Sequence, residues 1–103
     1  MGIREGQEEE YIRRHKEIWP EVVAGMLTSG VHSMSIYRAG RQLFLYMEVE
    51  NYAEMVRLLA DDPNSLRWEE YMAPIMENAA GEDYDPNNPY PAGLPEVFHW
   101  PFG

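Results

Sequence analysis

The stretch Val31-His-Ser-Met-Ser-Ile-Tyr-Arg-Ala-Gly-Arg-Gln-Leu-Phe-Leu-Tyr-Met-Glu-Val-Glu50 decides the fold that this sequence predicts. Residues 31–38 and 43–50 read as two strands, and residues 39–42 between them have the length and composition of a hairpin turn. Alternate residues of a strand share a face. In the second strand one face is apolar, and the other carries Phe44, Tyr46, Glu48 and Glu50. That second face is expected either to line a pocket or interface, or to run from the core into water.

A helix is predicted in front of the hairpin. Glu8–Glu10 mark its start, because negative charge is favourable at the N-terminal end of a helix dipole. Apolar residues then recur at steps of three or four positions. Pro20 predicts either a kink in this helix or a second helix that starts at the proline. Gly30 suits the C-terminal cap of that segment.

Two further helices are predicted after the hairpin. Asn51 and Glu54 form a capping box, and apolar residues follow it at helical spacing. A second helix is expected from Ser65 to about Ala79. Pro74 would kink this helix or split off its last turn, because proline lacks an N–H and clashes with the preceding turn.

The two ends of the chain complete the predicted order of elements. Gly2–Gly6 resembles the tail of a strand that ends in a turn, and Glu96–Trp100 reads as a final strand stopped by Pro101. Between the helices and that strand, residues 81–95 form an irregular Pro-rich loop, of the kind that serves either as a functional lid or as a connector.

These elements predict a βαββαβ order, which is the ferredoxin-like, split-βαβ arrangement of the α+β class. The sheet would be antiparallel with helices on one face, and one domain would span residues 1–103. The first strand, central in this order, is truncated, which leaves ladder groups of its neighbours unpaired. The other face of the sheet would be hidden by a second copy or used as a ligand cavity, lined by Phe44, Tyr46, Phe98 or His99.

Composition excludes several classes of function. A formal charge of −10 leaves no basic surface for nucleic acid or an anionic membrane. The chain has no cysteine, so disulfides, thiolate nucleophiles and Cys-bound metals are excluded. The three histidines lie on different predicted elements without the spacing of zinc helices, and no metal site is predicted. No signal or membrane-spanning pattern is present, and a cytoplasmic protein is expected.

The candidate chemistry lies in the first helix. Tyr11 and His15 are four residues apart, so their rings project from one helix face and can converge on one small ligand. Histidine exchanges a proton near neutrality, and tyrosine supplies a directional hydroxyl beside it. A second interpretation stays open at this point, in which both residues belong to the apolar stripe of a core helix.

Several collinear motifs make the chain resemble the L-rhamnose mutarotase family. The first, Glu10-Tyr-x-Arg-Arg-His-x-x-Ile-Trp-Pro-Glu21, is the most specific. The others are individually weak, but they follow in order: Gly30-x-His-x-x-x-Ile-Tyr37, Leu43-Phe44, Arg67-Trp-x-x-Tyr-Met72 and Glu96-Val-Phe98.

The resemblance implies a dimeric α+β isomerase that needs no cofactor and interconverts the α and β anomers of a deoxy-hexose, L-rhamnose or a related sugar. It implies that His15 is the proton-transferring residue and that Tyr11 and Trp68 hold the sugar. The expected partners are this monosaccharide and a second copy of the chain.

Two positions depart from the family pattern. Met34 stands where the family has a sugar-contacting tyrosine, and it offers no hydroxyl. Glu69 stands where the family has the second tryptophan of a Trp-Trp pair. Both are candidate sugar contacts. Glu69 would bind a sugar hydroxyl, serve as a second carboxylate, or be solvated at the helix surface.

Two other functions remain open on the sequence. One is a sugar-binding or regulatory domain that keeps the site but has lost turnover. The other is a different dimeric α+β barrel enzyme, such as a cofactor-independent monooxygenase, since fold alone does not fix function.

Overall fold

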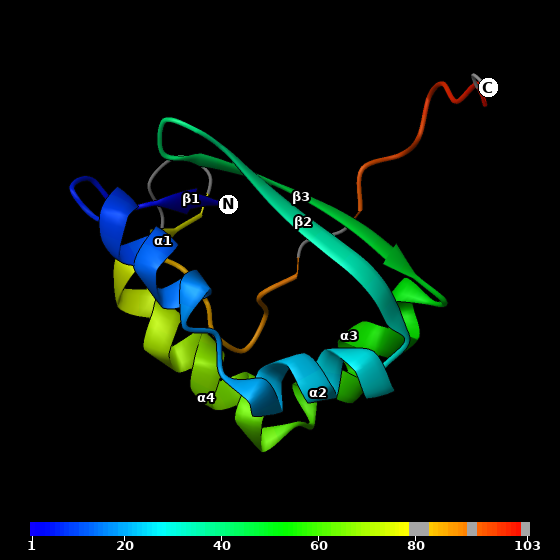
Figure 1. The fold of residues 1–103 in the computed structure, drawn as a ribbon, viewed down its shortest axis with the longest axis horizontal. Helices are drawn as coiled ribbons and strands as arrows, with labels where there is room; N and C mark the ends of the chain where they lie inside the picture. Colours follow the sequence, from blue (N-terminus) through cyan, green and yellow to red (C-terminus); the bar gives the residue numbers. More distant parts are fainter. Residues whose placement is uncertain (79–82, 91–92, 102–103) are drawn as a thin grey trace.

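The sheet has four antiparallel strands in the order β2-β3-β1-β4, which is the ferredoxin-like order that the sequence predicts (Figure 1). The computed structural model describes residues 1–78, 83–90 and 93–101. The long strands are β2 (Val31–Ala39) and β3 (Gln42–Val49), and the short ones are β1 (Gly2–Ile3) and β4 (Met76–Glu77). The helices lie together on one side of the β2–β3 hairpin, as expected (Figure 1).

The predicted hairpin is confirmed. Gly40 occupies its turn with a φ of 60°, a left-handed conformation that favours glycine. Ile36 pairs with Leu45, and Tyr37 pairs with Phe44. Since directly paired residues point to the same side of a sheet, Ile36 and Leu45 share the helix-covered side, whereas Tyr37 and Phe44 share the outer side.

The segment before the hairpin forms two helices, α1 (Glu8–Lys16) and α2 (Pro20–Thr28). Pro20 opens a new helix instead of kinking one, because Trp19 before it is extended, with φ −69° and ψ 133°. Gly30 has a φ of 95°, so its lack of a side chain allows the turn into β2.

The helices after the hairpin are α3 (Tyr52–Ala60) and α4 (Pro63–Met72). The predicted cap of α3 is present, because the Asn51 side chain accepts a hydrogen bond of 3.0 Å from the Glu54 amide. Asp62 caps α4 in the same manner, accepting from the Asn64 amide at 2.9 Å. The α4 helix thus begins slightly before the predicted Ser65.

The predicted extent of the last helix and the predicted last strand are both wrong. The α4 helix ends at Met72, and a 3-10 turn η1 (Ala73–Ile75) leads directly into β4. Pro74 cannot continue the helix, and Met76 is buried opposite Ile3. Glu96–Trp100 forms no strand and is exposed, so Phe98 and His99 line no cavity. Ala79 lies outside the described residues.

The first strand is as short as its sequence suggests. Gly2 pairs with Gln42 of β3, and Gly2 and Ile3 pair with Glu77 and Met76 of β4. Within the described residues, the remainder of β3 is paired with β2 alone. All four strands of the sheet therefore come from one chain, but the inner strand β1 is only two residues long.

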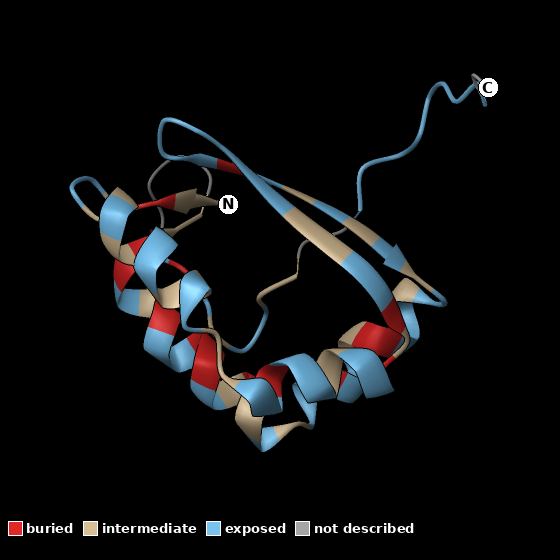
Figure 2. Cartoon of the chain, in the orientation of Figure 1, coloured by how far each residue is buried: buried red, intermediate tan, exposed pale blue. Residues whose placement is uncertain are grey.

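The core lies between the helices and the short strands. Buried residues gather on the helices and at the ends of the hairpin strands, while the hairpin's middle is exposed or partly buried (Figure 2). The larger cluster joins α1, α2 and α4 to β1 and β4, and the smaller one joins β2 to α3; their most buried members are Ile3, Val22, Met55 and Met72.

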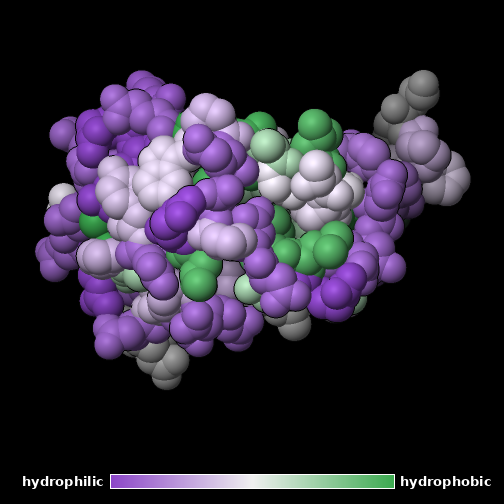
Figure 3. Space-filling view, turned by 90° about the horizontal axis from the view of Figure 1, so that it is seen from below, coloured by the Kyte–Doolittle hydropathy of each residue, from purple (hydrophilic) through white to green (hydrophobic). Residues whose placement is uncertain are grey.

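The outer surfaces differ in character. The outside of the helical layer is mostly hydrophilic, with apolar side chains gathered over α2 and α3 (Figure 3). The outer side of the sheet exposes Tyr37, Phe44 and Tyr46. In the part of the chain that the structure describes, no helix is both long and apolar enough to cross a membrane.

Candidate active site

The first helix presents Tyr11 and His15 together. Their rings stack with centroids 4.3 Å apart and an interplanar angle of 29°, as expected for residues four apart on one helix face. Tyr11 is buried, whereas His15 is only partly buried. The imidazole is therefore held by packing while one part of it remains accessible.

A hydrogen bond fixes the tautomer of His15. Its Nδ1 lies 3.2 Å from the carbonyl oxygen of Tyr11, and a carbonyl can only accept, so Nδ1 carries the hydrogen. Nε2 then holds the lone pair, and no described residue hydrogen-bonds to it. Burial lowers the pKa of His15 below its usual 6.5, and the hydrogen bond to Tyr11 opposes this only in part. The imidazole is thus a neutral base at pH 7.

Trp68 of α4 meets this pair from the side. The indole stands edge-on to His15, with ring centroids 5.5 Å apart and an interplanar angle of 82°. Trp68 is only 4% exposed, and Trp19 packs edge-on against it at 5.2 Å. Such edge-to-face contacts follow the charge distribution of aromatic rings. They set the orientation of the imidazole relative to α4.

Arg14 fastens α1 to α4 beside this aromatic cluster. Its guanidinium lies 4.0 Å from the ring centroid of Tyr71 and donates a hydrogen bond of 2.5 Å to the Tyr71 carbonyl. Glu10 accepts a further hydrogen bond of 2.8 Å from it. Because the Arg14 side chain is only 16% exposed, these contacts are largely shielded from water.

A cavity, here called the front cavity, opens beside His15 between the helices and the inner side of the hairpin. About 510 Å³ of atom-free space lies in and in front of it, part of it open solvent. All five predicted site residues line it: Tyr11, His15, Met34, Trp68 and Glu69. The remaining walls are mainly aliphatic, with Ile36 and Leu45 from the sheet and Met72 and Met76 from the helical side.

His15 can also be reached from a second side. An open hollow of about 650 Å³ lies between α1 and the hairpin, lined by Tyr11, His15, Ile36 and Arg38 among others. The imidazole is consequently not sealed in apolar packing, and a small ligand has room beside it.

Two tyrosines of the Pro-rich segment complete the front cavity, and the sequence did not indicate them. Tyr84 and Tyr90 both line it. The segment is anchored at Asp83, which pairs with Arg4 at 2.5 Å and forms an isolated bridge with Glu77. The only hint in the sequence is the presence of two large aromatic residues inside a segment otherwise typical of a loop.

Glu69 is not solvated; its side chain is buried, with 8% of the residue exposed. The hydroxyl of Tyr84 donates a hydrogen bond of 2.5 Å to Glu69 Oε2. Burial raises the pKa of Glu69 above its usual value, and the Tyr84 hydrogen bond partly offsets this. A carboxyl group in these surroundings keeps its proton to a higher pH than one in water.

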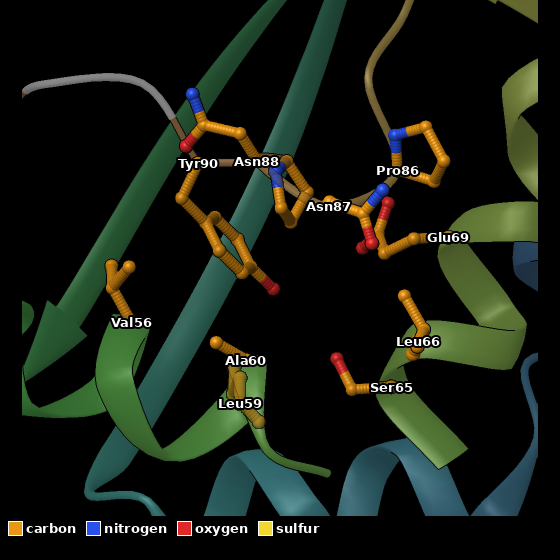
Figure 4. A pocket seen from close by; sticks show the side chains of 11 residues that line it. Val56, Leu59, Ala60, Ser65, Leu66, Glu69, Pro86, Asn87, Asn88 and Tyr90 are labelled. Atoms are coloured by element: carbon orange, nitrogen blue, oxygen red, sulfur yellow. The ribbon is translucent and has the colours of Figure 1, made fainter. Parts of the chain in front are cut away.

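A second cavity, the rear cavity, lies behind Glu69 between α3, α4 and the segment 86–90 (Figure 4). It holds about 410 Å³ of atom-free space and shares Glu69, Pro89 and Tyr90 with the front cavity. The hydroxyls of Ser65 and Tyr90 point into it from opposite sides (Figure 4). Glu69 therefore stands in the wall between two cavities.

The other histidines lie apart from this site. His32 is paired with Glu50 at 3.3 Å and His99 with Glu96 at 3.5 Å, and both are exposed. Phe44 and Tyr46 face outward from the sheet and take no part in the front cavity. The site thus combines one imidazole, one carboxyl and several aromatic rings around a mainly apolar hollow.

Comparison with known proteins identifies the family to which this chain belongs. The model of a family described as L-rhamnose mutarotase matches residues 1–100. Relatives named L-rhamnose mutarotase include one from Opitutus terrae, 38% identical over 101 residues, and one from Bacillus subtilis, 36% identical over 102 residues. Each alignment covers 96% of this chain and 91% of the relative.

A solved structure agrees with these matches. The crystal structure of an L-rhamnose mutarotase from Formosa agariphila superposes with a TM-score of 0.75 and 29% sequence identity, covering 97% of this chain and 92% of that one. The chain is accordingly an aldose mutarotase, an isomerase that acts on carbohydrates. It belongs to the L-rhamnose mutarotase family, which confirms the resemblance drawn from its motifs.

Proposed function

We propose that this protein interconverts the α and β anomers of L-rhamnose or a closely related deoxy-hexose, with His15 as a general acid/base. The observation that carries the proposal is the state of the imidazole. The hydrogen bond from Nδ1 to the Tyr11 carbonyl leaves Nε2 as the basic nitrogen, and the imidazole lines the front cavity. Family membership supports the choice of substrate.

The reaction requires two proton transfers. Ring opening removes the proton from the anomeric hydroxyl while the C1–O5 bond breaks and O5 gains a proton. Rotation about the C1–C2 bond then presents the other carbonyl face, and closure reverses both transfers. His15, neutral at pH 7, accepts the first proton and returns it on closure. Positioned acid/base catalysis of this kind typically contributes about 10²–10⁴-fold in rate.

The other residues at the front cavity would hold the sugar. Trp68 offers an indole for the C–H side of the pyranose, and the Tyr11 hydroxyl, which has no hydrogen-bond partner among the described residues, offers a polar contact. Met34 contributes an apolar wall and no hydroxyl. Glu69 supplies the carboxyl group among the lining residues. A mainly apolar wall suits a sugar that carries a methyl group.

We further infer that the protein works as a homodimer. The outer side of the sheet exposes three aromatic side chains, Tyr37, Phe44 and Tyr46, on two adjacent strands. Side chains of this size and type, gathered on one sheet face, are typical of a surface that a partner covers. A second copy of the chain would bring the same patch to a two-fold axis.

Saturation-transfer NMR on L-rhamnose tests the proposed function. Added protein should accelerate magnetisation exchange between the two anomeric signals. The His15→Ala variant should lose this acceleration, whereas His32→Ala, which removes an exposed histidine, should keep it. Line broadening without exchange would identify a sugar-binding domain instead of a catalyst. Equal rates with and without wild-type protein would refute the proposal.

A further inference from the structure

The proposed reaction needs a proton donor for the ring oxygen, and Glu69 is the candidate. The neutral imidazole of His15 can take the anomeric proton, but it cannot at the same time give one to the ring oxygen. Among the described residues that line the front and rear cavities, Glu69 is the only carboxylic acid, and no arginine or lysine accompanies it. It is also buried in the wall that both cavities share.

We propose that Glu69 is the second proton-transfer group of the reaction: it protonates the ring oxygen while His15 accepts the proton of the anomeric hydroxyl. This rests on the proposed function and assigns the half of the acid/base chemistry that His15 leaves open.

The carboxyl group is held in a defined orientation. Tyr84 donates to Oε2 at 2.5 Å, and no described residue hydrogen-bonds to Oε1. Among the described residues, every fully buried side-chain oxygen has a hydrogen-bond partner. Since Oε1 has none, it is not fully buried. One oxygen is therefore fixed by the protein, and the other remains available for a proton and for the substrate.

The groups around Glu69 favour its protonated form. The titratable side chains that face it are Tyr11 and His15 from α1 and Tyr84 and Tyr90 from the segment 83–90. All four are neutral at pH 7, since burial raises the pKa of each tyrosine and lowers that of His15. No arginine or lysine among the described residues lines either cavity, so only the Tyr84 hydrogen bond opposes the burial that raises the pKa of Glu69.

The rear cavity lets this carboxyl group equilibrate with solvent. Ser65 and Tyr90 place hydroxyls in it that have no hydrogen-bond partner among the described residues (Figure 4). These hydroxyls can hold water in the otherwise mainly apolar cavity, and that water can exchange protons with Glu69 while a sugar fills the front cavity. The pH dependence of the rate should consequently report the protonation of Glu69.

The step balances without any other reactant. The anomeric O–H bond breaks and its proton goes to His15 Nε2. The electron pair of the C1–O5 bond goes to O5, which takes the proton of Glu69 and leaves a carboxylate. Closure on the other face returns the proton from O5 to Glu69 and the proton of His15 to the new anomeric oxygen. Both side chains end as they began.

Anomer-exchange rates measured against pH and sugar concentration test this role. In the wild type the rate should fall toward alkaline pH as Glu69 loses its proton, and toward acid pH as His15 gains one. Glu69→Gln keeps the side-chain shape but cannot transfer a proton. This variant should lose about 10²–10⁴-fold in kcat and should lose the alkaline decline. Glu70→Gln, on the exposed side of the same helix, should match the wild type.

Tyr84→Phe provides a second test that does not depend on Glu69→Gln folding well. Without the hydroxyl that stabilises the carboxylate, the alkaline decline should move to higher pH. A Glu69→Gln variant with unchanged kcat and pH profile, or with only a higher KM, would overturn the proton-transfer role. An absence of exchange in the wild type would instead overturn the proposed function itself.

Discussion

The indole of Trp68 stands edge-on to the imidazole of His15, with the two ring centroids 5.5 Å apart. The two residues come from helices on opposite sides of the hairpin in the sequence, α1 and α4. Their contact therefore depends on how those helices pack, and so does the orientation of the imidazole. The role proposed for His15 and the packing of α4 can be tested separately.

Replacing Tyr11 by phenylalanine should weaken sugar binding without weakening the fold. The Tyr11 hydroxyl has no hydrogen-bond partner among the described residues, so its removal costs the folded protein little. A lost hydrogen bond to the sugar should raise KM about 2- to 10-fold. Thermal unfolding and NMR exchange kinetics check both parts. Tyr71→Phe removes a hydroxyl outside the front cavity and should leave KM unchanged.

The acid side of the pH profile should reflect the buried state of His15. Burial disfavours the charged imidazole, so its pKa lies below 6.5 and the neutral base persists to lower pH than in a free histidine. The decline of the exchange rate on the acid side should therefore lie below pH 6.5. NMR titration of the imidazole protons gives an independent value. An inflection at or above 6.5 would contradict the buried geometry.

Arg14→Lys should loosen α1 from α4. Lysine cannot lie flat over Tyr71 while donating to the Tyr71 carbonyl and to Glu10, so the free energy of unfolding should fall by about 1–2 kcal/mol. Arg57 provides a matched control. Its exposed side chain pairs with Glu54 of the same helix, α3, so Arg57→Lys should leave the denaturation midpoint unchanged. Equal effects of the two variants would show that the contact of Arg14 with Tyr71 does not stabilise the packing of α1 against α4.

Asn51→Ala should destabilise α3 and leave catalysis intact. The substitution removes the acceptor for the Glu54 amide, and loss of such a cap costs about 0.5–2 kcal/mol. Urea denaturation measures the change, and the exchange rate at a temperature well below unfolding should equal that of the wild type. Asn51→Asp keeps an acceptor and should recover most of the loss. A lowered exchange rate would show that α3 influences the site.

Phe44→Glu should dissociate the homodimer that we propose. The substitution places a charge in the aromatic patch of Tyr37, Phe44 and Tyr46, and burial of an unpaired charge opposes association. Sedimentation velocity should show a dimer for the wild type and a monomer for this variant. Leu27→Glu changes an equally apolar, exposed residue on the helical side and should remain dimeric. A monomeric wild type at micromolar concentration would refute the dimer.

Local signals predicted most of the fold. The hairpin, the new helix at Pro20 and the cap at Asn51 each follow from residues adjacent in sequence. The exception was β4. Met76 and Glu77 follow an apolar helix without a turn signal, and only their pairing with Gly2 and Ile3 makes them a strand. Pairing between distant segments is not encoded in local periodicity, so the exposed Glu96–Trp100 was the more strand-like candidate.

The same distinction applies to the site. Tyr11 and His15 could be placed together because they are one helical turn apart. The sequence favours a solvated Glu69, because it is a single glutamate near the start of its predicted helix. Its burial depends on Tyr84, which reaches it from a segment without helical or strand periodicity. When a segment distant in the sequence covers a carboxyl group, the residues next to that group in the sequence do not reveal its burial.

The two-residue centre of the sheet also bears on how the protein folds. The hairpin and each helix are built from near neighbours and can form early, but β1 and β4 come from distant parts of the chain and join late, since closing long loops is entropically slow. Their few hydrogen bonds should be among the first to open in the native state. Amide protons of Ile3 and its neighbours should thus exchange with deuterium sooner than those of the β2–β3 ladder, although they lie in the middle of the sheet.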